Sequence, residues 1–157
     1  LMPGAGHEGG LRGGTENVAG AAAFAAAARA RRERLEQDPR RYLSRRAALL
    51  EALRSAVPDL VPLGPEREQE TLGSILTVAV PGAAAEPLLH RMEAAGIYLG
   101  SGSACHSRGP ADSPVLAAIR CPKHLRNSIL RFSLDGSESA DDLSRAADAL
   151  QRCLAAA

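Results

Sequence analysis

The sequence predicts an α/β fold, in which a small α/β sandwich with helices mainly on one face follows an alanine-rich helical region. Two observations carry this prediction. From residue 71 onward the patterns run strand, helix, strand, short helix, strand and helix, an order typical of a sheet covered by helices. Residues 18–57 are rich in alanine and other strong helix formers. The chain has 157 residues, enough for one domain with a hydrophobic core.

The first third of the chain predicts a loop and two helices. Residues 1–14 are glycine-rich and aperiodic, which is typical of a loop, and their backbone N–H groups are open to a phosphate. Thr15 is the expected N-cap of a helix over residues 18–34. Pro39 interrupts this helix or begins a second one over residues 40–56. The expected buried face of the second helix is Leu43, Ala47, Leu50, Leu53 and Val57.

The remainder of the chain predicts alternating strands and helices. The expected elements are, in order, a short strand within 57–63, a charged loop over 64–70, a strand over 71–80, an amphipathic helix over 83–95 that Gly96 stops, a short strand over 97–99, a short helix over 113–119, a helical turn over 123–127, a strand over 129–134 and a last helix from Ser139. Asp112 or Ser113 is the expected cap of the short helix. The expected buried side of the last helix is Leu143, Ala146, Ala147, Leu150 and Leu154.

Composition argues against several classes of protein. The net charge is +1, and the arginines between Arg29 and Arg46 alternate with Glu and Ala, which favours a solvated helix face over a nucleic-acid site. The three cysteines include no Cys-x-x-Cys pair, which argues against a disulfide framework or an all-cysteine zinc site and indicates a reducing compartment such as the cytoplasm. No apolar run is long enough to predict a membrane span. The start lacks Met and a signal-peptide pattern, so we expect a cut N-terminus.

One cysteine lies among small residues. The stretch from Gly100 to Pro110 sets Cys105 among glycines, serines and an alanine, after a strand-like run and before an Asp-Ser-Pro turn signal. We expect a surface loop with an accessible thiol there. The residues alone leave open a reactive thiol or an incidental cysteine.

Three segments resemble one enzyme family. The run from Ser101 to Cys105, Ser-Gly-Ser-Ala-Cys, resembles the active-site loop of cysteine desulfurases, which are pyridoxal-phosphate enzymes, and of the related selenocysteine lyases. Residues 6–17 resemble the family's Gly-Gln-Glu and Arg-x-Gly-Thr-x-Asn segment, and residues 128–134 resemble its Ser-x-x-Arg-x-Ser strand. The resemblance implies the C-terminal part of a fold-type I enzyme of the class-V aminotransferase type. Its implied parts are a cofactor-proximal loop over 1–17 that ends a large domain, linking helices over 18–57, and a small α/β domain over 58–157 with the cysteine loop at 100–112.

The resemblance also implies roles for individual residues. Cys105 is the nucleophile whose thiolate takes the substrate sulfur as a persulfide while alanine leaves, and His106 helps to lower its pKa or is an ordinary solvated loop residue. Arg131 grips the substrate carboxylate, and the alternative is an edge-strand arginine paired to Asp135. Thr15 reaches the phosphate of the partner's cofactor in a homodimer, which is compatible with a helix cap. Two further expected helpers are Arg12 and Asn17.

The implied cofactor is pyridoxal phosphate. The only lysine, Lys123, lies where the family has no cofactor lysine, so we expect that lysine before Leu1 and no turnover by this chain alone. The implied partners are L-cysteine, a sulfur-acceptor or iron–sulfur scaffold protein and a second copy of the complete protein, with no nucleic acid and no membrane. His7, Glu8 and His90 lack a metal-ligand spacing, so no metal is expected. A selenocysteine lyase, a non-catalytic sulfur-relay module and a relative with a vestigial cysteine remain alternatives.

Overall fold

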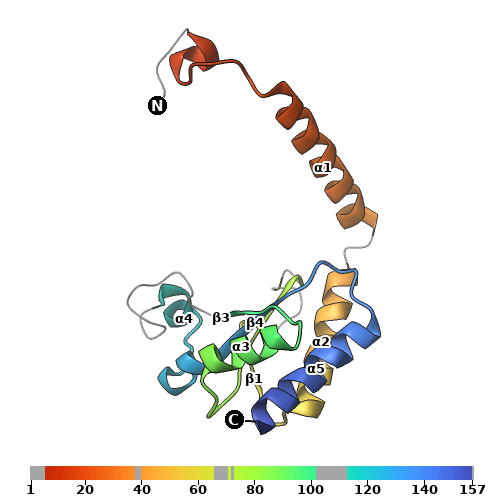
Figure 1. Cartoon of the computed structure of the whole chain (residues 1–157), viewed down its shortest axis with the longest axis vertical. Coiled ribbons are helices and arrows are strands. Elements are labelled where there is room, and N and C mark those ends of the chain that lie inside the picture. The colour runs from red at the N-terminus through yellow and green to blue at the C-terminus, as the bar shows by residue number, and fades with distance from the viewer. Residues whose placement is uncertain (1–5, 38–39, 66–70, 72, 102–112, 157) are drawn as a thin grey trace. The chain divides into compact units, whose positions relative to one another are not determined.

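The chain forms two compact units, Leu1–Pro39 and Arg40–Ala157, which are described one at a time (Figure 1). The computed structural model describes residues 6–37, 40–65, 71, 73–101 and 113–156. Within that part of the chain, no helix is both long and apolar enough to cross a membrane.

The first unit holds a turn of 3-10 helix, η1 (His7–Gly10), and the helix α1 (Val18–Gln37). Asn17 directly precedes α1, and its Oδ1 accepts a hydrogen bond from the backbone N–H of Gly20 at 2.9 Å. The expectation that Thr15 caps this helix is therefore wrong, because the asparagine two residues later satisfies the first turn. Every described side chain of α1 is exposed, so the helix buries no apolar face within its own unit.

The second unit opens with α2 (Arg41–Ala56), whose buried side chains include Tyr42 and Leu53. Leu53 confirms part of the expected face, but Ala47 is exposed and the expectation is wrong there. Tyr42 packs against Gly136, where an added Cβ would lie 3.1 Å from the tyrosine Cε1. The burial of Tyr42 thus depends on a glycine far away in the sequence, and the spacing of apolar residues along α2 cannot reveal that contact.

Four strands form one antiparallel sheet in the order β1-β2-β4-β3. The strands are β1 (Val61–Leu63), β2 (Ile75–Ala79), β3 (Gly100–Ser101) and β4 (Ile129–Ser133). The expected strand over residues 97–99 is wrong, because pairing begins only at Gly100. The N–H of Ile97 instead donates to the carbonyl of Met92 at 2.9 Å and closes the turn that ends the preceding helix.

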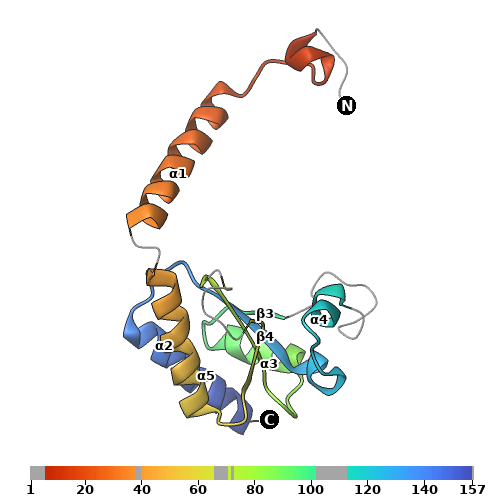
Figure 2. The ribbon, with the colours of Figure 1, turned by 180° about the vertical axis from the view of Figure 1, so that it is seen from behind.

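The remaining helices cover the two faces of the sheet unequally. They are α3 (Ala85–Ala94), α4 (Pro114–Ala118), η4 (Lys123–Ser128) and α5 (Ala140–Ala155). α2 and α5 lie side by side (Figures 1 and 2) and, with α3, enclose the main core around Leu76, Val78, Leu130 and Phe132. The other face carries a smaller cluster, in which Leu116 and Leu125 of α4 and η4 meet Ala79 and Ile129. The expectation of helices mainly on one face is confirmed.

Two serines begin helices as expected. Ser113 Oγ accepts from the N–H of Leu116 at 3.4 Å and caps α4. At α5, Ser139 Oγ accepts from the N–H of Asp142 at 3.1 Å, while an Asp142 carboxylate oxygen accepts from the N–H of Ser139 at 2.9 Å. This reciprocal pair is a capping box. Hydrogen bonds from the side chain and backbone of Ser139, together with the charge of Arg145, lower the pKa of Asp142.

Candidate functional site

Arg131 lies on an internal strand of the sheet. In β4 its neighbours Leu130 and Phe132 point into the main core, and the side chain of Arg131 is exposed. Because successive side chains of a strand point to opposite faces, Arg131 lies on the face away from α2, α3 and α5. The alternative of an edge-strand arginine is wrong, since β4 is paired on both sides.

The guanidinium of Arg131 lies against a glycine of the neighbouring strand. Gly100 is the residue of β3 directly opposite Arg131, and Thr77 of β2 is its opposite on the other side. A Cβ added to Gly100 would lie 3.0 Å from Nη2, 3.2 Å from Nε and 3.3 Å from Cζ of the arginine. The arginine head therefore occupies the space that a side chain at position 100 would take. The motif did not single out Gly100, and only the strand register identifies it.

The expected nucleophile follows this strand in the sequence. Cys105 and His106 belong to residues 102–112, which lie outside the described residues. The elements at either end of that segment are described: Ser101 ends β3, and Ser113 is the buried cap of α4. Arg131 thus lies beside the strand that leads into the cysteine segment.

The expected cofactor contacts lie in the first unit. Nη1 of Arg12 donates to the carbonyl of Gly14 at 3.2 Å and to that of Thr15 at 3.1 Å. Asn17 caps α1. Arg12 and Asn17, the two residues expected to assist the site, therefore make hydrogen bonds to the backbone near Thr15 and to the first turn of α1. Nδ1 of His7 lies 3.0 Å from Glu16 Oε1, a contact between two partly exposed side chains that the sequence did not suggest.

The described residues do not make a complete cofactor or metal site. Lys123 is exposed at the start of η4. Among the described residues, no three His, Cys, Asp or Glu side chains are grouped to hold a metal ion.

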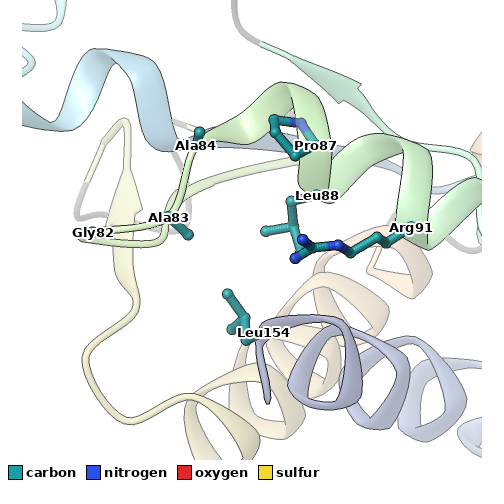
Figure 3. Close-up of a pocket in the computed structure, with 7 residues that line it drawn as sticks. All are labelled: Gly82, Ala83, Ala84, Pro87, Leu88, Arg91 and Leu154. Atoms are coloured by element: carbon teal, nitrogen blue, oxygen red, sulfur yellow. The ribbon is translucent and has the colours of Figure 1, made fainter. Parts of the chain in front are cut away.

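A separate pocket of about 190 Å³ lies between the turn before α3, α3 itself and the end of α5 (Figure 3). Leu88 and Leu154 line it, together with Arg91, whose Nη1 donates to the carbonyl of Cys153 at 3.1 Å. This arginine ties α3 to the carbonyl end of α5, where a positive charge is favourable. The lining holds no nucleophile and no acid, so we assign no reaction to this pocket.

Comparison with known proteins identifies relatives along nearly the whole chain. The model of the family described as aminotransferase class-V matches residues 5–145. A "NifS/IcsS protein homolog" of Lactobacillus delbrueckii subsp. bulgaricus is 34% identical over 94% of this chain and 40% of its own length. A cysteine desulfurase of Frankia sp. is 36% identical over 96% of this chain and 36% of that protein. The chain thus spans about two-fifths of the length of the curated relatives it matches.

Solved structures share the fold. A NifS-like protein superimposes with a TM-score of 0.82 at 22% identity, over 100% of this chain and 39% of that one. A NifS-like protein from Rickettsia africae gives a TM-score of 0.80 at 21% identity, over 99% of this chain and 39% of its own. At these identities the likeness establishes the fold alone.

Proposed function

The chain belongs to the class-V aminotransferase family, and on that premise we propose that it is the C-terminal part of a cysteine desulfurase. In this proposal the enzyme moves the sulfur of L-cysteine to Cys105 and releases alanine. The observation that carries the proposal is the exposed Arg131, whose guanidinium lies against Gly100 on the strand before the cysteine segment. The names of the relatives, several of them cysteine desulfurases, support it.

Arg131 binds the carboxylate of the substrate. A guanidinium offers two parallel N–H donors that match the two oxygens of a carboxylate. Gly100 faces Arg131 and lies five residues before Cys105. Five residues span at most about 18 Å when fully extended, so the thiol can reach a substrate held at this arginine. Gly100 leaves the room in which the arginine head lies.

Cys105 takes the sulfur. Its thiolate attacks the substrate sulfur, a sulfur–sulfur bond forms, and the bond between that sulfur and the substrate β-carbon breaks with its electron pair leaving on carbon. That carbon gains a proton, so one cysteine and one enzyme thiol become alanine and an enzyme persulfide. Pyridoxal phosphate, held mainly by parts of the enzyme outside this chain, supplies the electron sink. His106 follows Cys105 in the sequence, and its protonated form would favour the thiolate.

The first unit serves the cofactor of a second copy. Arg12 and Asn17 fix the backbone around Thr15, and the Thr15 hydroxyl donates to the cofactor phosphate across a homodimer. The persulfide then passes to a sulfur-acceptor or iron–sulfur scaffold protein in the cytoplasm. The chain's thiols and the absence of a disulfide framework in its sequence agree with a reducing compartment.

The test is Cys105→Ala in the complete protein that carries this chain. We expect sulfide release from L-cysteine in the presence of a reductant to fall at least about 100-fold, while the absorbance of the bound cofactor persists. Cys153→Ser is the matched control, because this partly buried cysteine lies on α5, and it should keep full activity. Sulfide release by the Cys105 variant at the rate of the control would refute the proposal.

A further inference from the structure

A basic groove runs between α2 and the edge strand β1. It encloses about 480 Å³ and is lined by Arg46, Leu50 and Arg54 of α2 and by residues 62–65 of β1 and the turn after it. None of the described residues that line it is acidic, and the description of this part of the chain stops at Pro65. We call this feature the α2–β1 groove, and it lies outside the site proposed above.

The helix wall of the groove repeats basic, apolar and basic side chains at every fourth residue. Residues four apart lie on the same face of a helix, so Arg46 and Arg54 are separated by about 12 Å along the axis. Leu50, half-buried, lies between them. Nε of Arg46 donates to the carbonyl of Ile75 at 3.3 Å, which holds this arginine against the first residue of β2.

The strand wall limits how a partner can bind. β1 is an edge strand, and such strands often pair with an added strand from another chain. Pro62 is the central residue of β1 and has no N–H to donate. An incoming segment therefore cannot rely on a continuous backbone ladder here and must be recognised through its side chains.

We propose that the α2–β1 groove docks an extended acidic segment of a partner protein. Extended chains advance about 3.3 Å per residue, so two carboxylates four residues apart are separated by about 13 Å and match the two arginines. An apolar residue midway between them meets Leu50. Paired guanidinium–carboxylate contacts supply the charge complementarity.

The position of the groove lets this partner stay bound while the surface around Arg131 remains accessible. β1 and β3 are the two opposite edges of the four-stranded sheet, about three strand spacings or 14 Å apart. A segment held at β1 leaves Gly100 and Arg131 uncovered. The inference does not depend on the proposed desulfurase activity, because binding is measured without turnover.

The experiment measures binding of a fluorescein-labelled peptide, with the core Glu-Ala-Leu-Ala-Glu between Gly-Ser flanks, to the 157-residue chain by fluorescence anisotropy. We expect a Kd of about 10–100 µM that weakens as salt is raised. Arg54→Glu should weaken it at least 10-fold, with Arg54→Gln as a milder variant if the first does not fold. Arg41→Glu is the matched control: it makes the same charge change on α2, about 20 Å from Arg54 along the axis, and should change Kd less than twofold.

Three outcomes would overturn the inference. One is the absence of binding at 1 mM peptide (roughly the −4 kcal/mol limit of weak association). Another is an equal loss in the Arg41 and Arg54 variants, which would indicate unspecific charge attraction. The third is binding only after the glutamates that follow Pro65, namely Glu66, Glu68 and Glu70, are changed to glutamine. That result would mean that the groove is a site for the chain's own acidic segment, which keeps a partner's segment from binding in the unaltered chain.

Discussion

Two helices of this chain show opposite ways of being stabilised. α5 begins with a reciprocal Ser139–Asp142 capping box and buries Leu143 and Leu150 in the core of its unit. α1 has an asparagine cap, but its described side chains are all exposed, and Phe24 is 77% exposed. Within its own unit α1 therefore depends on the intrinsic helix propensity of alanine, without the packing of a buried face that gives most protein helices their stability.

The contrast shows that the described side chains of α1 have no packing partner within their own unit. Residues 18–28 of α1 are apolar without interruption and all exposed, and a helix that is apolar on every face usually packs against other structure. The chain spans about two-fifths of its relatives' length, and on the proposal that it is the C-terminal part of a longer enzyme, the α1 surface packs against the rest of that enzyme. The second unit has its own core and does not need that contact.

The largest expected effect separates the two helices directly. Leu150→Ala, at a position with 0% exposure, should lower the free energy of unfolding of the 157-residue chain by about 3 kcal/mol, because it leaves a cavity. Phe24→Ala should change it by less than about 0.5 kcal/mol. Urea denaturation followed by circular dichroism measures both values. A loss above about 2 kcal/mol for Phe24→Ala in this chain would contradict the conclusion that α1 is unpacked here. The same loss seen only in a longer protein that contains this chain would show that α1 packs against the additional part.

A smaller effect concerns the caps of the same helices. Ser139→Ala removes the capping hydroxyl of α5 and should cost about 1 kcal/mol of global stability. Asn17→Ala makes the equivalent change in α1 and should cost less in the global transition, because α1 contributes little to the packed unit. Thermal and urea unfolding check this order. A larger cost for the Asn17 variant would show that α1 is part of the cooperative unit.

The α5 cap also predicts a dependence on pH. The hydrogen bonds from Ser139 lower the pKa of Asp142 in the folded state, so the unfolded chain binds a proton at a higher pH than the folded chain. The stabilisation is therefore complete above the ordinary pKa of an aspartate, near 4, and is lost as pH falls through the lowered value. Ser139→Ala should flatten the stability curve in that window, and an unchanged slope would contradict the assignment.

Local signals predicted more of this molecule than distant contacts did. Ser113 and Ser139 were predictable as caps, because a cap needs only the hydroxyl and the next helical turn. The strand at Gly100 and the burial of Tyr42 were not, since both depend on residues distant in the sequence. Thr15 was assigned the cap that belongs to Asn17, because both residue types suit that position and the helix begins two residues later than the threonine requires.

The same division holds for the candidate site. Arg131 was identified from a short motif, which resembled that of a known family. Gly100, which gives the arginine head its room, shows no sequence signal beyond being a glycine in a small-residue run. Its relation to Arg131 follows only from the register of β3 against β4. The candidate arginine could thus be proposed from the sequence, whereas the glycine that lies against its head could not.

The smallest expected effect concerns Gly100, the residue of β3 that lies opposite Arg131. Gly100→Ala should leave the free energy of unfolding within about 0.5 kcal/mol, because only the mobile head of Arg131 lies within 3.0–3.3 Å of the new Cβ. If the complete protein is the desulfurase proposed above, the displaced guanidinium should raise the KM for L-cysteine about threefold to fivefold with kcat nearly unchanged, because carboxylate binding weakens equally in the ground state and the transition state. Ser101→Ala, one residue along the same strand and opposite Leu130, is the control and should leave KM unaltered. An equal rise in KM in both variants would mean that β3 as a whole positions the arginine, and not the space left by the missing side chain of Gly100.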